Sequence, residues 1–68
     1  MITEIDRKLG KKVQKLRKKA GMTQEKLAES VSLSMKYIQF IESAKRKPSL
    51  KTVYKIASAL KVKPKELF

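Results

Sequence analysis

The stretch MTQEKLAESVSLSMKYIQFIES, residues 22–43, decides how this chain folds. Thr23 and Ser34 are good helix N-cap residues, and they predict two short helices, the first of which stops near Ser32. The small side chain of Ala28 would let these helices cross closely. The predicted inward positions of the pair are all apolar: Leu27, Ala28, Leu33, Ile38 and Ile41. We therefore predict two crossed helices joined by a tight turn, with an ordinary helical hairpin in a small bundle as the alternative.

Helical periodicity continues on both sides of this stretch. A first helix is predicted from the spacing of four apolar residues, Leu9, Val13, Leu16 and Ala20. Gly21 then supplies the left-handed residue that commonly ends a helix. Pro48 and Ser49 mark the next boundary, and they precede a fourth amphipathic helix with the apolar positions Leu50, Val53, Ile56, Ala57 and Leu60.

The end of the chain predicts one more helical turn. Pro64 suits the first position of a helix, and the turn would run through Leu67 and Phe68. No alternation with a period of two persists along the chain, which argues against strands. We predict an all-α fold, a compact five-helix bundle that forms a single domain over residues 1–68.

The composition excludes most kinds of catalytic and metal site. The chain contains no histidine and no cysteine, so the usual general base, the thiol nucleophile and the common metal ligands are missing. One aspartate, Asp6, and a few scattered glutamates leave little from which to build a pair of catalytic carboxylates. We expect a protein that is not an enzyme and that uses no metal and no cofactor.

The charge of the chain indicates a polyanionic partner. Lysine and arginine together number 18 against 6 acidic residues, for a net charge of +12. This exceeds what solubility requires of a small domain. No segment approaches the roughly 20 apolar residues of a membrane span, and the first residues carry acids in place of a signal peptide. Together with the predicted pair of crossed helices, which could enter a major groove, this charge leads us to expect a cytoplasmic protein that binds double-stranded DNA in the nucleoid. RNA or an anionic membrane surface is a remote alternative.

Several segments, in one order along the chain, resemble a known family. They are LRKKAGMTQEKLA (residues 16–28), YIQFIE (37–42), RKPSL (46–50) and ALKVKPKELF (59–68). They resemble the Xre family of phage-repressor and Cro-like helix-turn-helix domains, and the resemblance extends from about Leu9 to Phe68. It implies a lambda-repressor-like fold with the helix-turn-helix at the second and third helices. It also implies that the third helix reads DNA from the major groove.

The resemblance implies which residues hold the DNA backbone. Gln24, at the start of the second helix, would donate a hydrogen bond to a phosphate, where the helix dipole also favours an anion. Tyr37 would support the third helix and can offer its hydroxyl to a phosphate. The basic run Lys45, Arg46 and Lys47 would lie along the backbone near the minor groove.

Helical geometry predicts which residues of the third helix read bases. Lys36, Gln39, Phe40 and Ser43 point away from the inward isoleucines, while Ser34, Met35 and Tyr37 lie at the start and on the flanks. Lys36 suits guanine and Gln39 suits adenine. Phe40 suits a thymine methyl group, with a protein contact or packing onto the second helix as alternatives.

Two further residue sets have expected structural roles. The resemblance pairs Arg17 with Glu42 between the first and third helices, and we expect this ion pair to fix geometry. Residues that could form a dimer interface or complete the core are Tyr54, Val62, Leu67 and Phe68.

Three positions depart from the family pattern. The family usually has glycine where this chain has Ser32, Ala44 and Lys61. If these positions need a positive φ, each non-glycine residue costs on the order of 1 kcal/mol. Otherwise the turns differ locally from those of the family. We expect the fold to be retained with shifted helix ends.

Together these observations predict a sequence-specific transcription regulator, and more specifically a repressor that binds a palindromic operator as a homodimer. The alternatives are a restriction-modification controller, and an antitoxin that binds a toxin as well as its own promoter. Because the sequence ends at Phe68, we expect no ligand-sensing domain and no small-molecule ligand.

Overall fold

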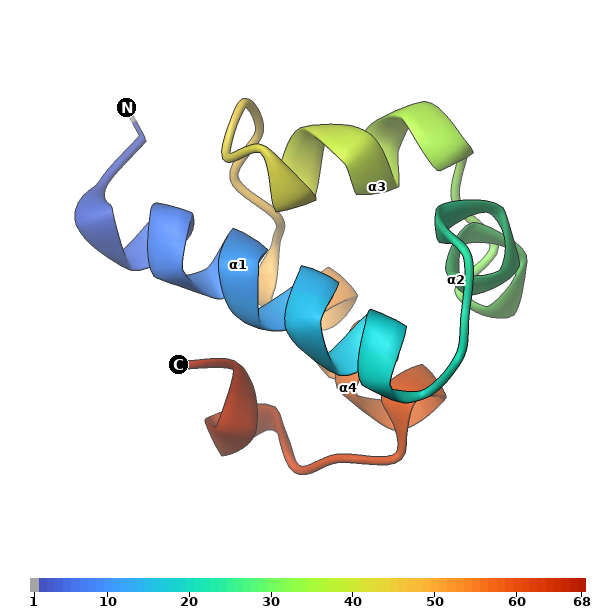
Figure 1. The fold of residues 1–68 in the computed structure, drawn as a ribbon. Helices are drawn as coiled ribbons and strands as arrows, with labels where there is room; N and C mark the ends of the chain where they lie inside the picture. Colours follow the sequence, from blue (N-terminus) through green and yellow to red (C-terminus); the bar gives the residue numbers. More distant parts are fainter. Residues whose placement is uncertain (1) are drawn as a thin grey trace.

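The computed structural model describes residues 2–68, and all the regular structure in this range is helical. Figure 1 shows four α-helices, α1 (Glu4–Lys19), α2 (Gln24–Ser30), α3 (Met35–Glu42) and α4 (Leu50–Leu60), followed by a 3-10 helix, η1 (Pro64–Leu67). The predicted all-α class is confirmed. The predicted count of five α-helices is wrong, because the last element is so short that its hydrogen bonds close tighter turns, as from the Glu66 amide to the Lys63 carbonyl at 2.9 Å.

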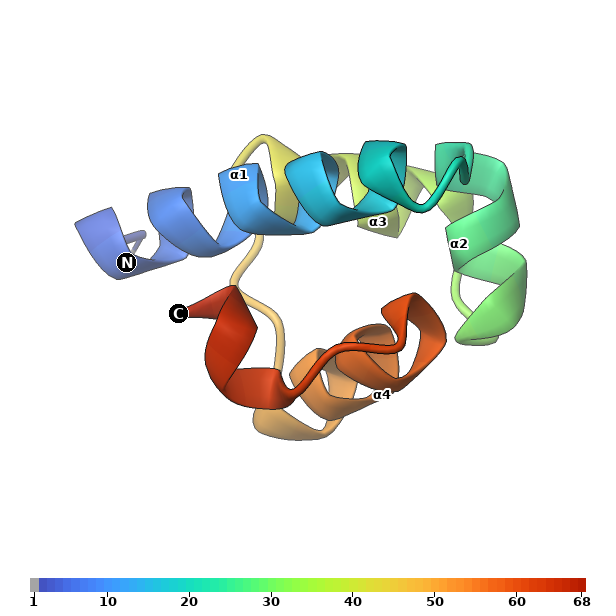
Figure 2. The same ribbon diagram turned by 60° about the horizontal axis from the view of Figure 1, so that its bottom comes forward.

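The helices form two layers around one cluster of buried side chains. In Figure 2, α1, α2 and α3 make the upper layer, and α4 with η1 packs beneath them. The buried apolar residues come from every element: Leu9, Val13, Leu27, Ala28, Val31, Ile38, Ile41, Val53, Ile56, Ala57, Leu60 and Leu67. Ala20, which the periodicity placed on the inner face of the first helix, is instead an exposed cap residue at the end of α1.

Each α-helix begins at a hydroxyl side chain that caps its first turn. The side chains of Thr3, Thr23, Ser34 and Ser49 each accept a hydrogen bond from the backbone N–H three residues later. In α1 the cap is reciprocal, because the backbone N–H of Thr3 donates to Asp6 Oδ2 at 2.8 Å. That bond holds the pKa of the Asp6 carboxyl below its ordinary value. Its stabilising contribution is therefore present at neutral pH and is lost as the pH falls through the lowered pKa.

The ends of the α-helices share one backbone motif. A residue with positive φ follows each of them, at Gly21 (φ 73°), Ser32 (58°), Ala44 (59°) and Lys61 (59°). The next residue then donates its N–H to the carbonyl five positions earlier, as from Met22 to Arg17 at 3.0 Å. The equivalent bonds at the other three ends run from Leu33 to Ala28, from Lys45 to Phe40 and from Val62 to Ala57. This is the Schellman arrangement, which satisfies carbonyls that the helix leaves free.

The three non-glycine positions therefore adopt the left-handed conformation that glycine favours. The reason lies in the residues that follow them. Leu33 and Val62 pack against the core, so the turns before them are fixed by burial as well as by hydrogen bonds. The strain at Ser32 and Lys61 is thus offset by these contacts, and the strain at Ala44 is offset by the hydrogen bonds from the Lys45 and Arg46 amides to the Phe40 carbonyl.

Replacing Ser32, Ala44 and Lys61 by glycine is expected to stabilise the fold. Removing Cβ relieves about 1–2 kcal/mol of left-handed strain per site. The greater conformational entropy of glycine in the unfolded chain offsets about half of this gain. The net gain is roughly 0.5–1 kcal/mol per site, or a rise in Tm of several degrees. Thermal unfolding followed by circular dichroism measures it. A matched control is Ser58→Gly inside α4, which should lower the Tm, and equal behaviour of both kinds of variant would contradict the expectation.

A glycine inside α1 sets the distance between α1 and α3. A Cβ atom on Gly10 would lie 2.5 Å from the carbonyl oxygen of Ile41 and 2.8 Å from that of Glu42. These are backbone atoms, so no side-chain rotation could make room. Gly10 was not among the residues that the sequence singled out. It fixes where α3 sits on the first helix, and so where the outer face of α3 is presented.

Candidate nucleic-acid interface

The outer face of α3 carries polar and basic side chains on a rigidly packed helix. Ile38 and Ile41 are buried on the inner side. Lys36 and Gln39 are exposed, and the half-buried Phe40 is not part of the core cluster. Met35, at the first turn, is 44% exposed. The outer face of α3 therefore presents two hydrogen-bonding side chains and two apolar side chains to a binding partner.

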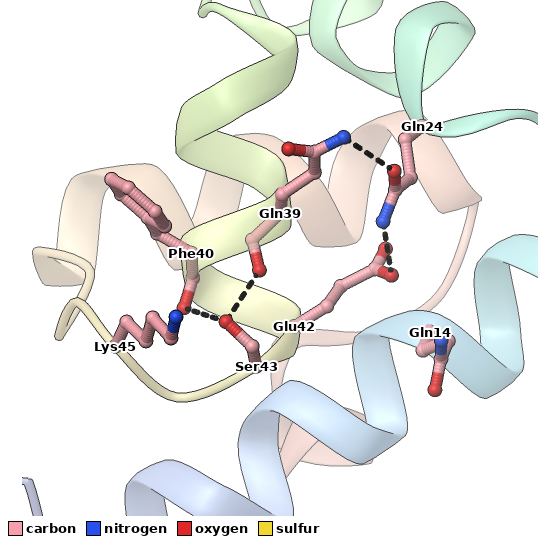
Figure 3. Close-up of a pocket in the computed structure, with 7 residues that line it drawn as sticks. All are labelled: Gln14, Gln24, Gln39, Phe40, Glu42, Ser43 and Lys45. Carbon is pink, nitrogen blue, oxygen red and sulfur yellow. Dashed lines mark hydrogen bonds between the residues drawn. The ribbon is translucent and has the colours of Figure 1, made fainter.

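The Phe40 ring lies next to a lysine of the same helix. The Lys36 ammonium nitrogen lies 6.0 Å from the centre of the Phe40 ring, one helical turn away. Figure 3 shows Phe40 beside Lys45, on the rim of a shallow hollow whose other lining residues are Gln14, Gln24, Gln39, Glu42 and Ser43. An aromatic ring in this place offers an apolar contact next to the positive charge of Lys36.

Gln24 joins α2 to α3 through hydrogen bonds. Its Nε2 donates to Glu42 Oε1 at 3.1 Å, and its Oε1 accepts from Gln39 Nε2 at 3.2 Å. Figure 3 shows the three side chains in this order at the edge of the hollow. The sequence treated Gln24 as an independent side chain, whereas the structure connects it to the predicted base reader Gln39. One Nε2 hydrogen of Gln24 remains for another acceptor.

Arg17 and Glu42 form a buried ion pair beneath this chain of amides. The Arg17 Nε donates to Glu42 Oε2 at 2.7 Å, and a terminal guanidinium nitrogen donates to Glu42 Oε1 at 3.1 Å. The two side chains are only 8% and 3% exposed. The other terminal nitrogen of Arg17 donates to the carbonyl oxygen of Met22 at 2.8 Å. One guanidinium thus ties α1 to both the start of α2 and the end of α3.

The basic run lies directly after α3 and is tied back to it. Lys45, Arg46 and Lys47 are exposed. The backbone N–H groups of Lys45 and Arg46 donate to the Phe40 carbonyl at 2.8 and 3.3 Å. The guanidinium of Arg46 lies 5.8 Å from the centre of the half-buried Tyr37 ring. The run is therefore positioned relative to the helix that it follows.

The two serines at the ends of α3 have local hydrogen-bonding roles. Ser34 Oγ accepts from the Tyr37 N–H at 3.1 Å, which leaves the Ser34 hydroxyl proton free to donate. Ser43 Oγ donates to the Gln39 carbonyl at 2.8 Å, so its proton is already used. Of the two, Ser34 is the better donor to an anion.

The dimer candidates separate into core and surface residues. Leu67 is fully buried, because η1 folds it into the core, which is the second of the two roles expected for it. Val62 is half-buried against the same core. Tyr54 and Phe68 are 55% and 60% exposed.

The structure adds two exposed apolar residues to this surface, Ile5 and Leu50, which are 64% and 62% exposed. Together with Phe68 they line a groove between the first turns of α1 and α4. Sequence periodicity assigned Leu50 to the core and did not consider Ile5. The start of α1 and the C-terminal end of the chain frame this groove. They lie on the same side of the molecule in Figures 1 and 2.

Comparison with known proteins assigns this architecture to a family. The profile of the family described as Helix-turn-helix, HTH_3, matches residues 13–67. The chain belongs to the helix-turn-helix family. An HTH-type transcriptional regulator of Archaeoglobus fulgidus is 40% identical over 57 residues, which cover 84% of this chain and 81% of the relative. The control protein C.BamHI of Bacillus amyloliquefaciens is 43% identical over 68 residues, which cover 98% of this chain and 84% of the relative.

A solved helix-turn-helix structure agrees with both the fold and the sequence. The restriction-modification controller protein C.AhdI of Aeromonas hydrophila superposes with a TM-score of 0.89 at 37% identity, covering 91% of this chain and 94% of the other. These relationships confirm the prediction of a DNA-binding transcription regulator of the helix-turn-helix class. Among residues 2–68, no helix is long and apolar enough to cross a membrane.

Proposed function

We propose that this chain is a repressor that binds a palindromic operator in double-stranded DNA as a homodimer, with α3 in the major groove. The observation that carries the proposal is the outer face of α3. It presents Lys36 and Gln39 to solvent and is followed directly by three exposed basic residues, Lys45, Arg46 and Lys47. A short helix of this kind fits the width of the major groove, and flanking cations can hold the phosphates.

The side chains divide into anchors and readers in this proposal. Lys45, Arg46 and Lys47, with the free Nε2 hydrogen of Gln24 and the hydroxyls of Ser34 and Tyr37, contact the backbone and carry no sequence information. Lys36 donates to guanine, Gln39 pairs with adenine, and Phe40 and Met35 contact thymine methyl groups. Ser43 lies at the edge of the same face.

Selection of bound duplexes from a random pool tests the proposal. Titration of the selected duplex at several salt concentrations then gives the number of phosphate contacts from the slope of log K against log salt. We expect an enriched palindromic motif with half-sites about one helical turn apart. If no motif is enriched, the chain is a non-specific polyanion binder and the proposal is wrong.

The division into anchors and readers gives a distinct prediction. Lys36→Ala and Gln39→Ala are each expected to relax the preference at one base pair by roughly 1–3 kcal/mol. Lys45→Ala is expected to weaken binding to all duplexes alike and to flatten the salt slope by about one unit. Fluorescence anisotropy with the selected duplex and its single-base variants measures both effects. The same loss pattern in all three variants would contradict the division.

A restriction-modification controller is the second candidate function. It is favoured by the similarity to C.BamHI over nearly the whole chain and by the close superposition on C.AhdI. The candidate predicts that the selected motif occurs upstream of restriction endonuclease or methyltransferase genes next to the gene for this chain. A motif found only before unrelated genes counts against it.

For the homodimer, we propose that the groove between α1 and α4 is the contact surface. Of the five large apolar side chains that are exposed among residues 2–68, Ile5, Leu50 and Phe68 line this groove, and Tyr54 lies one helical turn beyond Leu50. The groove also includes Lys47, which is the last residue of the basic run, and Pro48, which follows it. A two-fold contact across it would relate the two copies of α3 and of the basic run by the same symmetry that relates the half-sites of a palindrome.

The charge of the chain gives this dimer a characteristic salt dependence. Two copies that each carry a net charge of +12 repel each other, so the attraction must come from apolar contact. Added salt screens the repulsion and strengthens the dimer, whereas it weakens DNA binding. Opposite salt dependences of the two equilibria are thus expected from one chain.

Leu50→Ser combined with Phe68→Ser is expected to give a folded monomer. Both side chains are exposed, so the core is left intact, and the palindrome should lose at least tenfold in affinity while a half-site does not. Sedimentation equilibrium at low and high salt measures the association. The matched control is Met35→Ser, an exposed apolar residue outside the groove, which should leave the dimer unchanged. A double variant that associates like the parent would place the interface elsewhere.

A further inference from the structure

An unbroken series of hydrogen bonds runs from the buried ion pair to the surface of α3. It starts at Arg17, passes through Glu42 and Gln24, and ends on the exposed Gln39. The amide-to-carboxylate distance is 3.1 Å and the amide-to-amide distance is 3.2 Å. The exposed end of this series is the side chain that the proposed function assigns to base reading.

The chemistry of the buried end fixes the direction of every bond. The carboxylate of Glu42, paired with a guanidinium, can only accept. Gln24 must therefore turn its Nε2 toward Glu42, which leaves Oε1 facing Gln39. That oxygen can only accept as well, so Gln39 must direct its Nε2 toward Gln24.

This direction decides which hydrogen-bonding groups Gln39 has left. With one Nε2 hydrogen given to Gln24, Gln39 keeps one N–H donor and its Oε1 acceptor. Adenine presents one acceptor, N7, and one donor, N6–H, in the major groove, so the two edges match. If Gln39 were reversed, both N–H groups would face outward, and two donors match the two acceptors O6 and N7 of guanine.

We propose that Glu42 and Gln24 are positioning residues that fix the amide orientation of Gln39 and thereby select adenine over guanine at the base pair it reads. The inference rests on the proposed function, because it takes Gln39 as a reader. It adds that the choice between two bases is made by a buried carboxylate that does not touch the DNA.

Gln24→Lys tests the inference by reversing the direction of the bonds. A lysine ammonium has donors only, so it can still bond Glu42 but can no longer accept from Gln39. Gln39 would then turn its Oε1 inward and expose both N–H groups. We expect the preference at that one base pair to change from adenine to guanine, by a factor of roughly 5 to 100 in relative affinity. A Gln24→Lys variant that still prefers adenine overturns the inference.

Two companion variants separate this effect from charge and from loss of a phosphate contact. Gln14→Lys adds the same charge in the same hollow, and Gln14 has no part in the hydrogen-bond series, so it should strengthen binding to all duplexes without changing the preferred base. Gln24→Met removes the bonds without replacing them, and it should reduce the discrimination between adenine and guanine as well as the overall affinity. Full discrimination in Gln24→Met would also overturn the inference.

A measurement on the free chain distinguishes failure of this inference from failure of the proposed function. The side-chain amide resonances of Gln39 in the 15N-labelled chain should move in Gln24→Met and stay in place in Gln14→Lys. If they do not move in Gln24→Met, the connection is absent and the inference fails. If they move but Gln39→Ala leaves the base preference of the parent unchanged, Gln39 is not a reader, and both the reader assignment and the base selection are overturned.

Discussion

Replacing Gly10 by alanine is expected to remove most of the stability of this protein. In an isolated helix the change would be favourable by about 1 kcal/mol, because glycine is the poorer helix former. Here the added Cβ would lie 2.5 Å from the Ile41 carbonyl oxygen and 2.8 Å from that of Glu42. Both contacts are with backbone, so α1 and α3 must move apart. We expect a loss of about 3 kcal/mol or more.

A loss of that size is large for a domain of this length. Native domains have roughly 0.05–0.15 kcal/mol of stability per residue, and a change of 1 kcal/mol moves the Tm of a small domain by about 4–8 °C. Urea unfolding of the two proteins measures the difference. Gly21→Ala is the matched control, because a Cβ there meets nothing within 4 Å and only the positive φ of 73° is strained. Equal stabilities of the two variants would show that the close approach of α1 and α3 at Gly10 does not determine the stability of the fold.

The boundaries of the helices could be predicted from sequence because they depend on local chemistry. Thr23, Ser34 and Ser49 each cap a helix through their own side chains, and Pro64 occupies the first position of the last one. A cap needs only a hydroxyl and an N–H three residues away, so the sequence contains the whole interaction. The inward faces followed from periodicity for the same reason.

Contacts between distant segments could not be predicted in this way. Gly10 meets the backbone of the end of α3, and nothing near residue 10 in the sequence signals that approach except a glycine inside a helical pattern. Gln24 looked free because the sequence does not reveal that Glu42 and Gln39 converge on it from another helix. Leu67 and Phe68 are neighbours with opposite burial, which depends on how η1 packs.

The left-handed positions illustrate a local rule that tertiary structure overrides. Glycine is the residue that such turns favour, so the sequence suggested altered turns at Ser32, Ala44 and Lys61. The turns persist because the hydrogen bonds that follow them, with Leu33 and Val62 packed on the core, outweigh the strain. Local preference therefore set the energetic cost of these turns and not their conformation.

Arg17→Ala is expected to destabilise the fold by about 3–5 kcal/mol, because it leaves the carboxylate of Glu42 buried without its counter-charge. It also removes the donor to the Met22 carbonyl, which ties the start of α2 to α1. Urea unfolding at low and high salt measures the loss. Because both partners are buried, the loss should change little with salt, unlike that of a surface pair. A variant that melts like the parent would mean that the pair contributes nothing to the fold.

Removing both charges separates the cost of an orphaned charge from the value of the pair. In the double variant Arg17→Met with Glu42→Leu, no buried charge remains, and apolar replacements of buried ion pairs are often neutral or stabilising. We expect it to recover much of the stability that Arg17→Ala loses. Recovery will stop short of the parent, because the Gln24 amide and the Met22 carbonyl each lose a partner. A double variant as unstable as Arg17→Ala would instead show that the directional hydrogen bonds, and not charge compensation, hold α1 against α3.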